Sequence, residues 1–371
     1  MLDTFVKKAI KLEPVPPEAT EAYHSNSEKL VAQVNREITG RGDLRTLIGD
    51  NSFNVLFDNH RHHVSFMDSV FYFNNFEMLA RNLPWVYRTY ISRGFSPDYF
   101  PAVLGAWIGA IQLHIDPATR DPLLRVYEWM LESHRDILEL SAQEELFQGP
   151  VEGSTIGHAA SRFVDSLLKQ DLRRSMQLAM EMVRSGMEVE ALYLEVLQPS
   201  LYRIGTLWES GKISVAHEHL ASATVTRIMA AIYAERVTTR RNMGKVVVTS
   251  SPNEYHEIGA WMVSDMLELH GWDVRYLGAN TPKEDLLNLL EAFRPDILGI
   301  SVTMPFNLRN ADGIVSAVRK NSTFGHMKIM MGGALFNVMG ELYKNMGADG
   351  SARNVKGACR LAAQWYQEEV T

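Results

Sequence analysis

One short polar loop carries the residues best suited to metal chemistry. A β-rich run at residues 245–249 breaks into this loop, which holds Glu254, His256 and Gly259 before a helical pattern begins. A loop that joins a strand to a helix lies at the carboxyl edge of an open α/β sheet, where such sheets bind ligands. An imidazole there can bind a metal through one ring nitrogen while a nearby carboxylate holds the other. We therefore expect His256 to ligate a metal with Glu254 as its support, the alternative being a surface or helix-capping histidine.

Alternating β and helical patterns place this loop in a parallel sheet, and they assign residues 241–371 to an α/β domain. The β-rich runs lie at 245–249, 273–277, 297–302 and 328–331. Helical stretches separate them, and this rhythm predicts a doubly wound fold. Small and polar residues follow the third and fourth runs, so we expect them at the same sheet edge as His256.

Three pieces of sequence, in chain order, resemble the signature of cobalamin-binding domains: Glu254-x-His256-x-x-Gly259, Ser301-x-Thr303 and Gly332-Gly333. The resemblance implies a flavodoxin-like (Rossmann-type) domain in which His256 replaces the cofactor's own benzimidazole on cobalt. It also implies a slot beside the sheet for the displaced nucleotide tail, which small residues would leave open. Glu254 stands where the family more often has Asp, which keeps the carboxylate and lengthens its reach.

Length, charge and cysteine usage exclude several classes of function. The chain has 371 residues, and at roughly 100–200 residues per domain this predicts two or three domains. Its net charge is −7 without a Lys/Arg cluster, so we expect no direct nucleic-acid binding. The sequence starts without the apolar core of a signal peptide, and no stretch approaches the ~20 apolar residues of a membrane span. The single Cys359 excludes an internal disulfide, and we expect a cytoplasmic protein.

A second helical region, assigned to residues 151–240, precedes the sheet. Its predicted helices span 154–168, 171–185, 189–208 and 215–234. A four-helix bundle directly before a cobalamin-binding domain resembles the cap that covers the upper face of the corrin ring in that family.

The corner between the last two of these helices combines a Trp with polar residues. Gly211 can end one helix and Ser214 can cap the next. Trp208 would then end the first helix while Glu218 and His219 begin its neighbour, so that the turn brings the three together. The alternative is an ordinary helix-turn-helix corner with a buried Trp and a polar rim.

This spacing resembles the upper-face motif of B12-dependent photoreceptors of the CarH type. The resemblance implies that Trp208 shields the 5′-deoxyadenosyl group of adenosylcobalamin, that Glu218 binds its ribose and that His219 supports this pocket. Val215 matches a further contact position. One position departs from the family, because those receptors have a His directly after the Trp and this chain has Glu209. The family's His takes the upper cobalt position after photolysis, so the upper ligand of this chain after photolysis is left open.

Residues 1–150 are assigned to an all-α domain rich in aromatic residues. Residues 1–24 hold three prolines, Pro14, Pro16 and Pro17, and we expect them to form a loose arm. Apolar periodicity predicts helices over 53–73, 76–93 and 99–113. The aromatic side chains would form the core of a helical bundle or, alternatively, the walls of a pocket for a flat conjugated ligand.

An aromatic helical domain ahead of this cap and sheet resembles the photocobilins, which are B12 photoreceptors that also bind biliverdin. The resemblance is specific for residues 154–371 and architectural for the N-terminal part, and it implies biliverdin as a second chromophore. The propionates of biliverdin would need cations, and its pyrrole N–H groups would need acceptors or a π partner. The candidates are Arg88 and Arg93 for the propionates, and Asp58, His60, His62, His63 and Tyr72 for the pyrroles.

These patterns together predict a signalling protein rather than an enzyme. We expect light to cleave the cobalt–carbon bond, and the cap to repack around the emptied adenosyl pocket. The repacking would change the quaternary structure of a homo-oligomer, expected to be a dimer. The output would pass through assembly or a separate effector protein. The alternatives are a corrinoid methyl carrier serving a methyltransferase, which the large Trp208 argues against, and a plain cobalamin store or DNA-free antirepressor.

Overall fold

The computed structural model of the chain describes residues 1–143, 157–236 and 241–370. By packing, the chain forms two compact units. The first is Met1–Gly149 together with Thr206–Ile213, and the second is Pro150–Gly205 together with Ser214–Thr371. The segment Thr206–Ile213 therefore packs with the first unit, although in chain order it lies between two segments of the second unit. The domain boundaries predicted near residues 150 and 240 lie outside the described residues.

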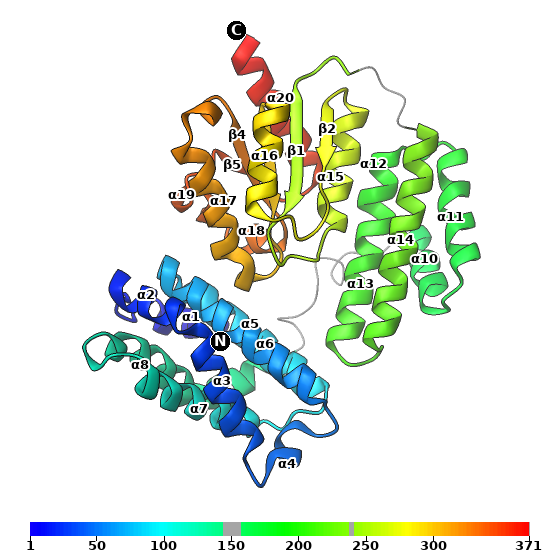
Figure 1. Cartoon of the computed structure of the whole chain (residues 1–371). Helices are drawn as coiled ribbons and strands as arrows, with labels where there is room; N and C mark the ends of the chain where they lie inside the picture. The colour runs from blue at the N-terminus through cyan, green and yellow to red at the C-terminus, as the bar shows by residue number, and fades with distance from the viewer. Residues whose placement is uncertain (144–156, 237–240, 371) are drawn as a thin grey trace. The chain divides into compact units, whose positions relative to one another are not determined.

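The first unit is helical (Figure 1). Its helices are α1 (Leu2–Ala9), α2 (Pro17–Ser25), α3 (Ser27–Thr39), α4 (Leu44–Ile48), α5 (Phe53–Phe73), α6 (Phe76–Ser92), α7 (Tyr99–His114), α8 (Pro117–Glu132) and α9 (His134–Ser141). The three helices predicted from apolar periodicity are confirmed as α5, α6 and α7. Helix α3 packs on α5 and α7, α6 packs on α1 and α9, and α2 packs on α5 and α8.

Aromatic side chains fill the interior of this unit. Tyr23, Trp107 and Tyr127 are fully buried, and the hydroxyl oxygens of Tyr23 and Tyr127 lie 2.6 Å apart. The rings of Tyr87 and Phe100 stack with their centroids 3.5 Å apart. Buried aromatic pairs of this kind stabilise a helical core through both burial and ring geometry.

The prediction of a loose arm over residues 1–24 is wrong. Helices α1 and α2 cover most of this segment, and Phe5, Ala9 and Tyr23 are buried. Pro17 is the first residue of α2, a position where the missing N–H sacrifices no helical hydrogen bond. The prolines therefore lie between two packed helices and at the start of the second, instead of keeping the segment unfolded.

The helical region predicted before the sheet is present, and apart from the segment Thr206–Ile213 it belongs to the second unit. It consists of α10 (His158–Leu168), α11 (Leu172–Arg184), α12 (Val189–Leu192), a π-helical turn η2 (Tyr193–Leu197), α13 (Gln198–Glu209) and α14 (Val215–Arg236). The start predicted for the first cap helix, residue 154, lies outside the described residues. Ser214 caps α14 as predicted, because its Oγ accepts a hydrogen bond from the His217 amide at 3.4 Å.

A parallel sheet forms the rest of the second unit (Figure 1). Its strands are β1 (Lys245–Ser250), β2 (Asp273–Tyr276), β3 (Ile297–Ser301), β4 (Lys328–Gly332) and β5 (Gly350–Ser351), in the spatial order β2-β1-β3-β4-β5. This is the flavodoxin-like order, so the predicted fold class is confirmed and the topological switch point lies between β1 and β3. Strand β5 was not predicted, because two residues carry no readable periodicity.

Helices cover the sheet. They are α15 (Ile258–Leu269), α16 (Lys283–Phe293), η3 (Pro305–Asn307), α17 (Leu308–Lys320), η4 (Ser322–Phe324), α18 (Ala334–Val338), α19 (Leu342–Asn345) and α20 (Val355–Val370). Helices α15 and α20 share one apolar cluster with β1 and β2, in which Trp272 and Trp365 are buried. Across the described residues, no helix has both the length and the apolarity needed to cross a membrane.

Two tyrosines of the cap donate hydrogen bonds to acids on α15. Tyr193 in η2 donates to Asp265 Oδ2 at 2.7 Å, and Tyr233 in α14 donates to Glu268 Oε2 at 2.5 Å. Residues three apart lie on the same face of a helix, so one face of α15 receives both contacts. Helix α15 therefore holds the cap through two hydrogen bonds, and Lys356 of α20 adds an ion pair to Glu190 of α12 at 3.7 Å.

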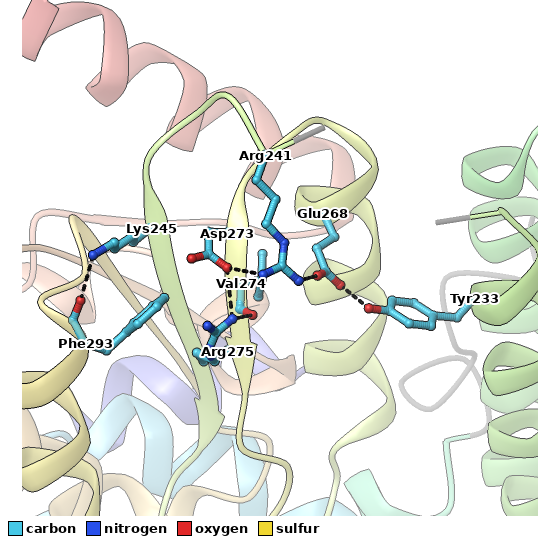
Figure 2. A network of polar contacts seen from close by, with 8 residues as sticks. All are labelled: Tyr233, Arg241, Lys245, Glu268, Asp273, Val274, Arg275 and Phe293. Carbon is cyan, nitrogen blue, oxygen red and sulfur yellow. Dashed lines mark hydrogen bonds and ion pairs between the residues drawn. The ribbon is translucent and has the colours of Figure 1, made fainter. Parts of the chain in front are cut away.

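A polar network continues from this contact to the edge strand β2. Figure 2 shows Arg241 between Glu268 and Asp273, with nitrogen–oxygen distances of 3.1 and 2.7 Å. Arg275 also donates to Asp273 at 2.9 Å, and its guanidinium lies 4.5 Å from the ring centroid of Phe293. Cationic side chains on an edge strand disfavour pairing with a strand of another molecule.

The contact between Tyr193 and Asp265 leads to a prediction about pH. Burial raises the pKa of Asp265 to about 7, although hydrogen bonds from Tyr193 and Trp261 act to lower it. The folded chain therefore keeps a proton that the unfolded chain releases near pH ~4, so this group lowers stability as the pH rises from about 4 to about 7. Between about pH 5 and about pH 8, we expect the free energy of unfolding of the wild type to fall by on the order of 3 kcal/mol more than that of Asp265→Asn. Urea denaturation of the wild type and the variant at the two pH values measures this difference. An equal fall in the free energy of unfolding of both proteins would contradict the raised pKa of Asp265.

Candidate functional site

The loop between β1 and α15 holds His256 at the carboxyl edge of the sheet. The Ser251 amide donates to the Ser301 carbonyl at 3.0 Å, which ties the loop to the end of β3. The Asn253 amide donates to Asn280 Oδ1 at 2.8 Å, which ties it to the segment after β2. Asn253 has a φ of 63°, a left-handed conformation that Asn adopts more readily than most residues. The loop is thus fixed from both sides of β1.

The Glu254 carboxylate organises the site, and its side chain is 0% exposed. Its Oε1 accepts from His256 Nδ1 at 2.6 Å and from the His256 amide at 3.1 Å. Its Oε2 accepts from the amides of Thr303 and Met304 at 2.9 and 2.8 Å, and from Asn307 Nδ2 at 3.1 Å. The Thr303 backbone therefore contacts Glu254. Met304 and Asn307 were missed from the sequence, where the only signal was a side-chain amide four residues after Thr303.

Opposing effects set the protonation of this pair. Burial acts to raise the pKa of Glu254, but the hydrogen bond and the charge of His256 outweigh it, and the pKa is lowered. Burial acts to lower the pKa of His256, but the hydrogen bond and charge of Glu254, and then the charge of Glu218, outweigh it, and the pKa is raised. An ionised Glu254 that accepts from Nδ1 leaves Nε2 as the His256 nitrogen that could ligate a metal.

The free edge of the imidazole faces outward. The His256 side chain is 60% exposed although its partner Glu254 is not exposed at all. Tyr255, its neighbour in the loop, and Val338, at the end of α18, are also strongly exposed. An exposed aromatic side chain next to an outward imidazole is consistent with a surface that a ligand covers.

The glycines of the signature have different surroundings. A Cβ on Gly259 would meet nothing within 4 Å, so this position leaves open space. Gly333 has a φ of 94°, and a Cβ there would lie 2.3 Å from the Val302 carbonyl oxygen. Gly333 is therefore required by the backbone, whereas a Cβ on Gly332 would come no closer than 3.8 Å to the Ala352 carbonyl oxygen. Ser301, which pairs with Gly332 in the sheet register, is almost fully buried.

The first turns of α14 carry a second polar group. Glu218 Oε2 accepts from His219 Nδ1 at 2.6 Å, and its Oε1 accepts from Ser222 Oγ at 2.7 Å. Val215, the first residue of the helix, is exposed. Because the charge of Glu218 contributes to the raised pKa of His256, the start of α14 lies within electrostatic reach of the sheet edge. Ser222 was missed from the sequence.

Trp208 lies near the end of α13, in the segment Thr206–Ile213 that packs with the first unit. The guanidinium carbon of Arg93 is 4.3 Å from the centroid of the Trp208 ring. The indole Nε1 is buried and has no hydrogen-bond acceptor among the described residues. By packing, Trp208 belongs to the first unit, whereas Glu218 and His256 belong to the second.

Two of the histidines considered for biliverdin lie in a buried network of the first unit. His60 is 1% exposed, and its ring nitrogens contact Asn35 Oδ1 at 2.5 Å and the Tyr99 hydroxyl at 3.0 Å. His63 Nε2 contacts the Tyr127 hydroxyl at 3.1 Å, and its ring lies against Trp107. Burial lowers the pKa of His60 to about 4 and that of His63 to about 3, so both are neutral at pH 7.

The other candidates for biliverdin occupy different surroundings. Asp58 and His62 are exposed on α5, with Asp58 paired to Arg61, and Tyr72 near the end of α5 is also exposed. Arg88 lies on α6 and Arg93 directly follows it. These residues therefore divide between a buried core, an exposed helix face and the end of α6.

Comparison with known proteins identifies a cobalamin-binding module in the second unit. Residues 244–360 match a family described as a B12 binding domain, and residues 159–233 match a second family with the same description. The sheet domain and the cap around His256 and Glu218 therefore form a cobalamin-binding module.

Two kinds of curated protein are similar to this chain. Dimethylamine corrinoid protein 2 of Methanosarcina acetivorans is 25% identical over 158 residues, which are 42% of this chain and 73% of that protein. The HTH-type transcriptional repressor CarH of Myxococcus xanthus is 33% identical over 177 residues, which are 47% of this chain and 52% of the repressor. The solved structure of the Methanosarcina barkeri monomethylamine corrinoid protein has a TM-score of 0.51 at 19% identity, covering 56% of this chain and 97% of that one, which supports the fold alone.

Replacing Glu254 by Gln tests the role of the buried carboxylate. The new NH2 group must face either the His256 ring N–H or the Thr303 and Met304 amides, so at least one buried donor loses its acceptor. We expect Glu254→Gln to lower the free energy of unfolding by about 2 kcal/mol. It should also lower the pKa of His256, which Glu254 raises. Urea denaturation and an NMR titration of the cofactor-free protein measure these effects.

The matched control is Glu218→Gln, which removes the other charge that raises the pKa of His256 but leaves the buried donors satisfied. It should lower the pKa of His256 with little loss of stability. A His256 pKa that is unchanged in Glu254→Gln would contradict the assigned pairing.

Proposed function

We propose that this chain is a light sensor that binds adenosylcobalamin with the cofactor's own base displaced and His256 beneath the cobalt. The observation that carries the proposal is the outward imidazole of His256, supported by the buried Glu254 at the switch point of the sheet. One imidazole supplies one ligand, so the metal it binds must bring its other ligands with it, as cobalt in a corrin ring does. When bound, adenosylcobalamin would supply a light-sensitive cobalt–carbon bond.

The residues around His256 fit a cobalamin. Nε2 is outward and available, the open space at Gly259 leaves room beside the loop, and exposed Tyr255 and Val338 offer apolar cover. In the first unit, the buried Nε1 of Trp208 has no acceptor among the described residues, and the adenosyl group that the resemblance to the photoreceptors implies would supply one. A polar group that is buried without a partner is costly, so a ligand that satisfies it gains affinity.

Glu218 is the residue proposed to hold the ribose of the adenosyl group. Its two oxygens are already oriented by His219 and Ser222 before any ligand binds. A carboxylate fixed in this way loses little conformational freedom on binding two hydroxyl groups. His219 acts in this proposal through Glu218, as the resemblance to the photoreceptors implies.

The signal is proposed to arise in the cap. Departure of the adenosyl group would remove the contacts that Trp208 and Glu218 make to it. Packed helices respond to such a loss by moving to another discrete arrangement. We propose that this movement changes the contacts between copies of the chain in a homo-oligomer, or the contacts with a separate effector protein.

The second candidate function is a methyl carrier for a methyltransferase. It is favoured by the similarity to the dimethylamine corrinoid protein of Methanosarcina acetivorans, which covers 73% of that protein. We prefer the light sensor because identity to the CarH repressor is higher, at 33% against 25%, and because the spacing of Trp208 and the Glu218–His219 pair resembles the upper-face motif of those receptors.

Light response separates these functions. Protein reconstituted with adenosylcobalamin should change its visible spectrum and its gel-filtration volume under green light. Trp208→Ala should still bind cobalamin, but light should no longer change its elution volume. Methyl transfer from methylcobalamin without a light-dependent change in size would favour the carrier, and binding without either response would indicate a cobalamin store.

We further propose that the first unit binds biliverdin as a second chromophore. The support is the resemblance to photocobilins. Both ring nitrogens of His60 and the Nε2 of His63 already contact core oxygen atoms, whereas His62 and Tyr72 are exposed and Arg88 is half-buried. We therefore propose Arg88, His62 and Tyr72 as the more accessible candidates.

Titration with biliverdin tests this second proposal. We expect a far-red-absorbing complex whose affinity falls at least several-fold in Arg88→Ala, because a propionate loses its cation, and is unchanged in His256→Ala. If no far-red band forms, the two-chromophore proposal is wrong while the cobalamin proposal stands.

A further inference from the structure

The end of α6 contacts the segment Thr206–Ile213, which comprises the end of α13 and the residues after it. The Arg93 guanidinium stacks on the Trp208 ring at 4.3 Å, and Arg93 Nη2 donates to the Trp208 carbonyl oxygen at 2.8 Å. One arginine thus fixes both the ring and the backbone of the same Trp. The planar guanidinium can satisfy both contacts at once, which an ammonium group cannot.

A close backbone approach lies beside this contact. Ser92 Oγ donates to the Glu209 carbonyl oxygen at 2.6 Å. Gly211 has a φ of 70°, and a Cβ there would lie 2.7 Å from the Ser92 carbonyl oxygen. A glycine is therefore required here for two reasons, the left-handed backbone and the space that α6 occupies.

The Glu209 side chain also turns toward α6. Its carboxylate accepts a hydrogen bond from the Trp85 indole and lies near the Arg88 guanidinium. Trp85, Arg88 and Ser92 are spaced three and four residues apart, so they form one face of α6. Glu209 stands where photoreceptors of the CarH type have a His, and here the side chain at that position interacts with α6.

We infer that α6 is the positioning element for Trp208, with Arg93 as the positioning residue, and that the contacts between Arg93 and Trp208 respond to the occupancy of the cobalamin site. The coupling rests on the proposed function, in which Trp208 covers the upper face of the cofactor. A ligand that shifts Trp208 must strain or break the Arg93 contacts. By reciprocity, a change in α6 must then alter the affinity for that ligand.

Amide hydrogen exchange of the cofactor-free protein tests the positioning role. Residues 85–93 and 206–213 should exchange about tenfold faster in Arg93→Ala, because a cation–π contact and a charge-assisted hydrogen bond are lost. Arg93→Lys should restore only part of the protection. The matched control is Arg81→Ala, which removes an arginine of the same helix whose partner is Glu77. It should leave both segments unchanged.

A second variant approaches the contact from the other side. Gly211→Ala pushes against Ser92 without touching Arg93, and it should raise exchange in the same two segments. The positioning role is overturned if Arg93→Ala and Gly211→Ala both leave exchange in residues 85–93 at the wild-type rate.

Loading the protein in the dark tests the coupling. With saturation verified by the absorption spectrum, adenosylcobalamin should change exchange in residues 85–93 of the wild type at least several-fold, and hydroxocobalamin should change it less. Arg93→Ala should bind both cobalamins but lose this response. An identical exchange rate in loaded and cofactor-free wild type overturns the coupling. These readouts need no light, so a protein that shows the coupling but no light response would disprove the proposed function and leave this inference standing.

Discussion

A buried negative charge at the edge of the sheet is the constraint on which the site depends. A carboxylate can be buried at low cost only if its oxygens are hydrogen-bonded and its charge is paired. Glu254 meets both conditions through His256 on one oxygen and the amides of Thr303 and Met304 on the other. The same residue therefore joins the loop after β1 to the segment after β3 and fixes the tautomer of the imidazole. The orientation of the His256 ring and the integrity of the switch point cannot be separated in this fold.

The cap bonds to helix α15 near the end of α14 and carries polar side chains near the start of α14. Tyr233 lies near the end of α14 and bonds Glu268, and Tyr193 bonds Asp265 on the same helix α15. Glu218 lies in the first turn of α14, in a helix of 22 residues that spans ~30 Å. A helix held at its C-terminal end can move most at its N-terminal end. In the proposed function, the start of α14 would therefore be the part of this helix that responds to a ligand.

Periodic patterns predicted the fold well, and contacts between distant segments limited the prediction of the site. Strands β1–β4 and helices α5–α7 have apolar repeats that residue types alone reveal, whereas the two-residue β5 and the short amphipathic α1 do not stand out. His256 and Glu254 were found because their spacing is local. The backbone amide of Met304 leaves no mark in a sequence, and neither does the approach of Arg93 to Trp208 across 115 positions. Arg93 was considered for a propionate because a cation near aromatic residues suits several partners, and only packing distinguishes them.

The most direct measurement is an electron paramagnetic resonance spectrum of the protein loaded with cob(II)alamin, with and without 15N-labelled histidine. If His256 lies beneath the cobalt, the nitrogen splitting changes its multiplicity on labelling, and the response to labelling disappears in His256→Ala. A splitting that does not change with histidine labelling would mean that the cofactor keeps its own base or another ligand, and would contradict the site described.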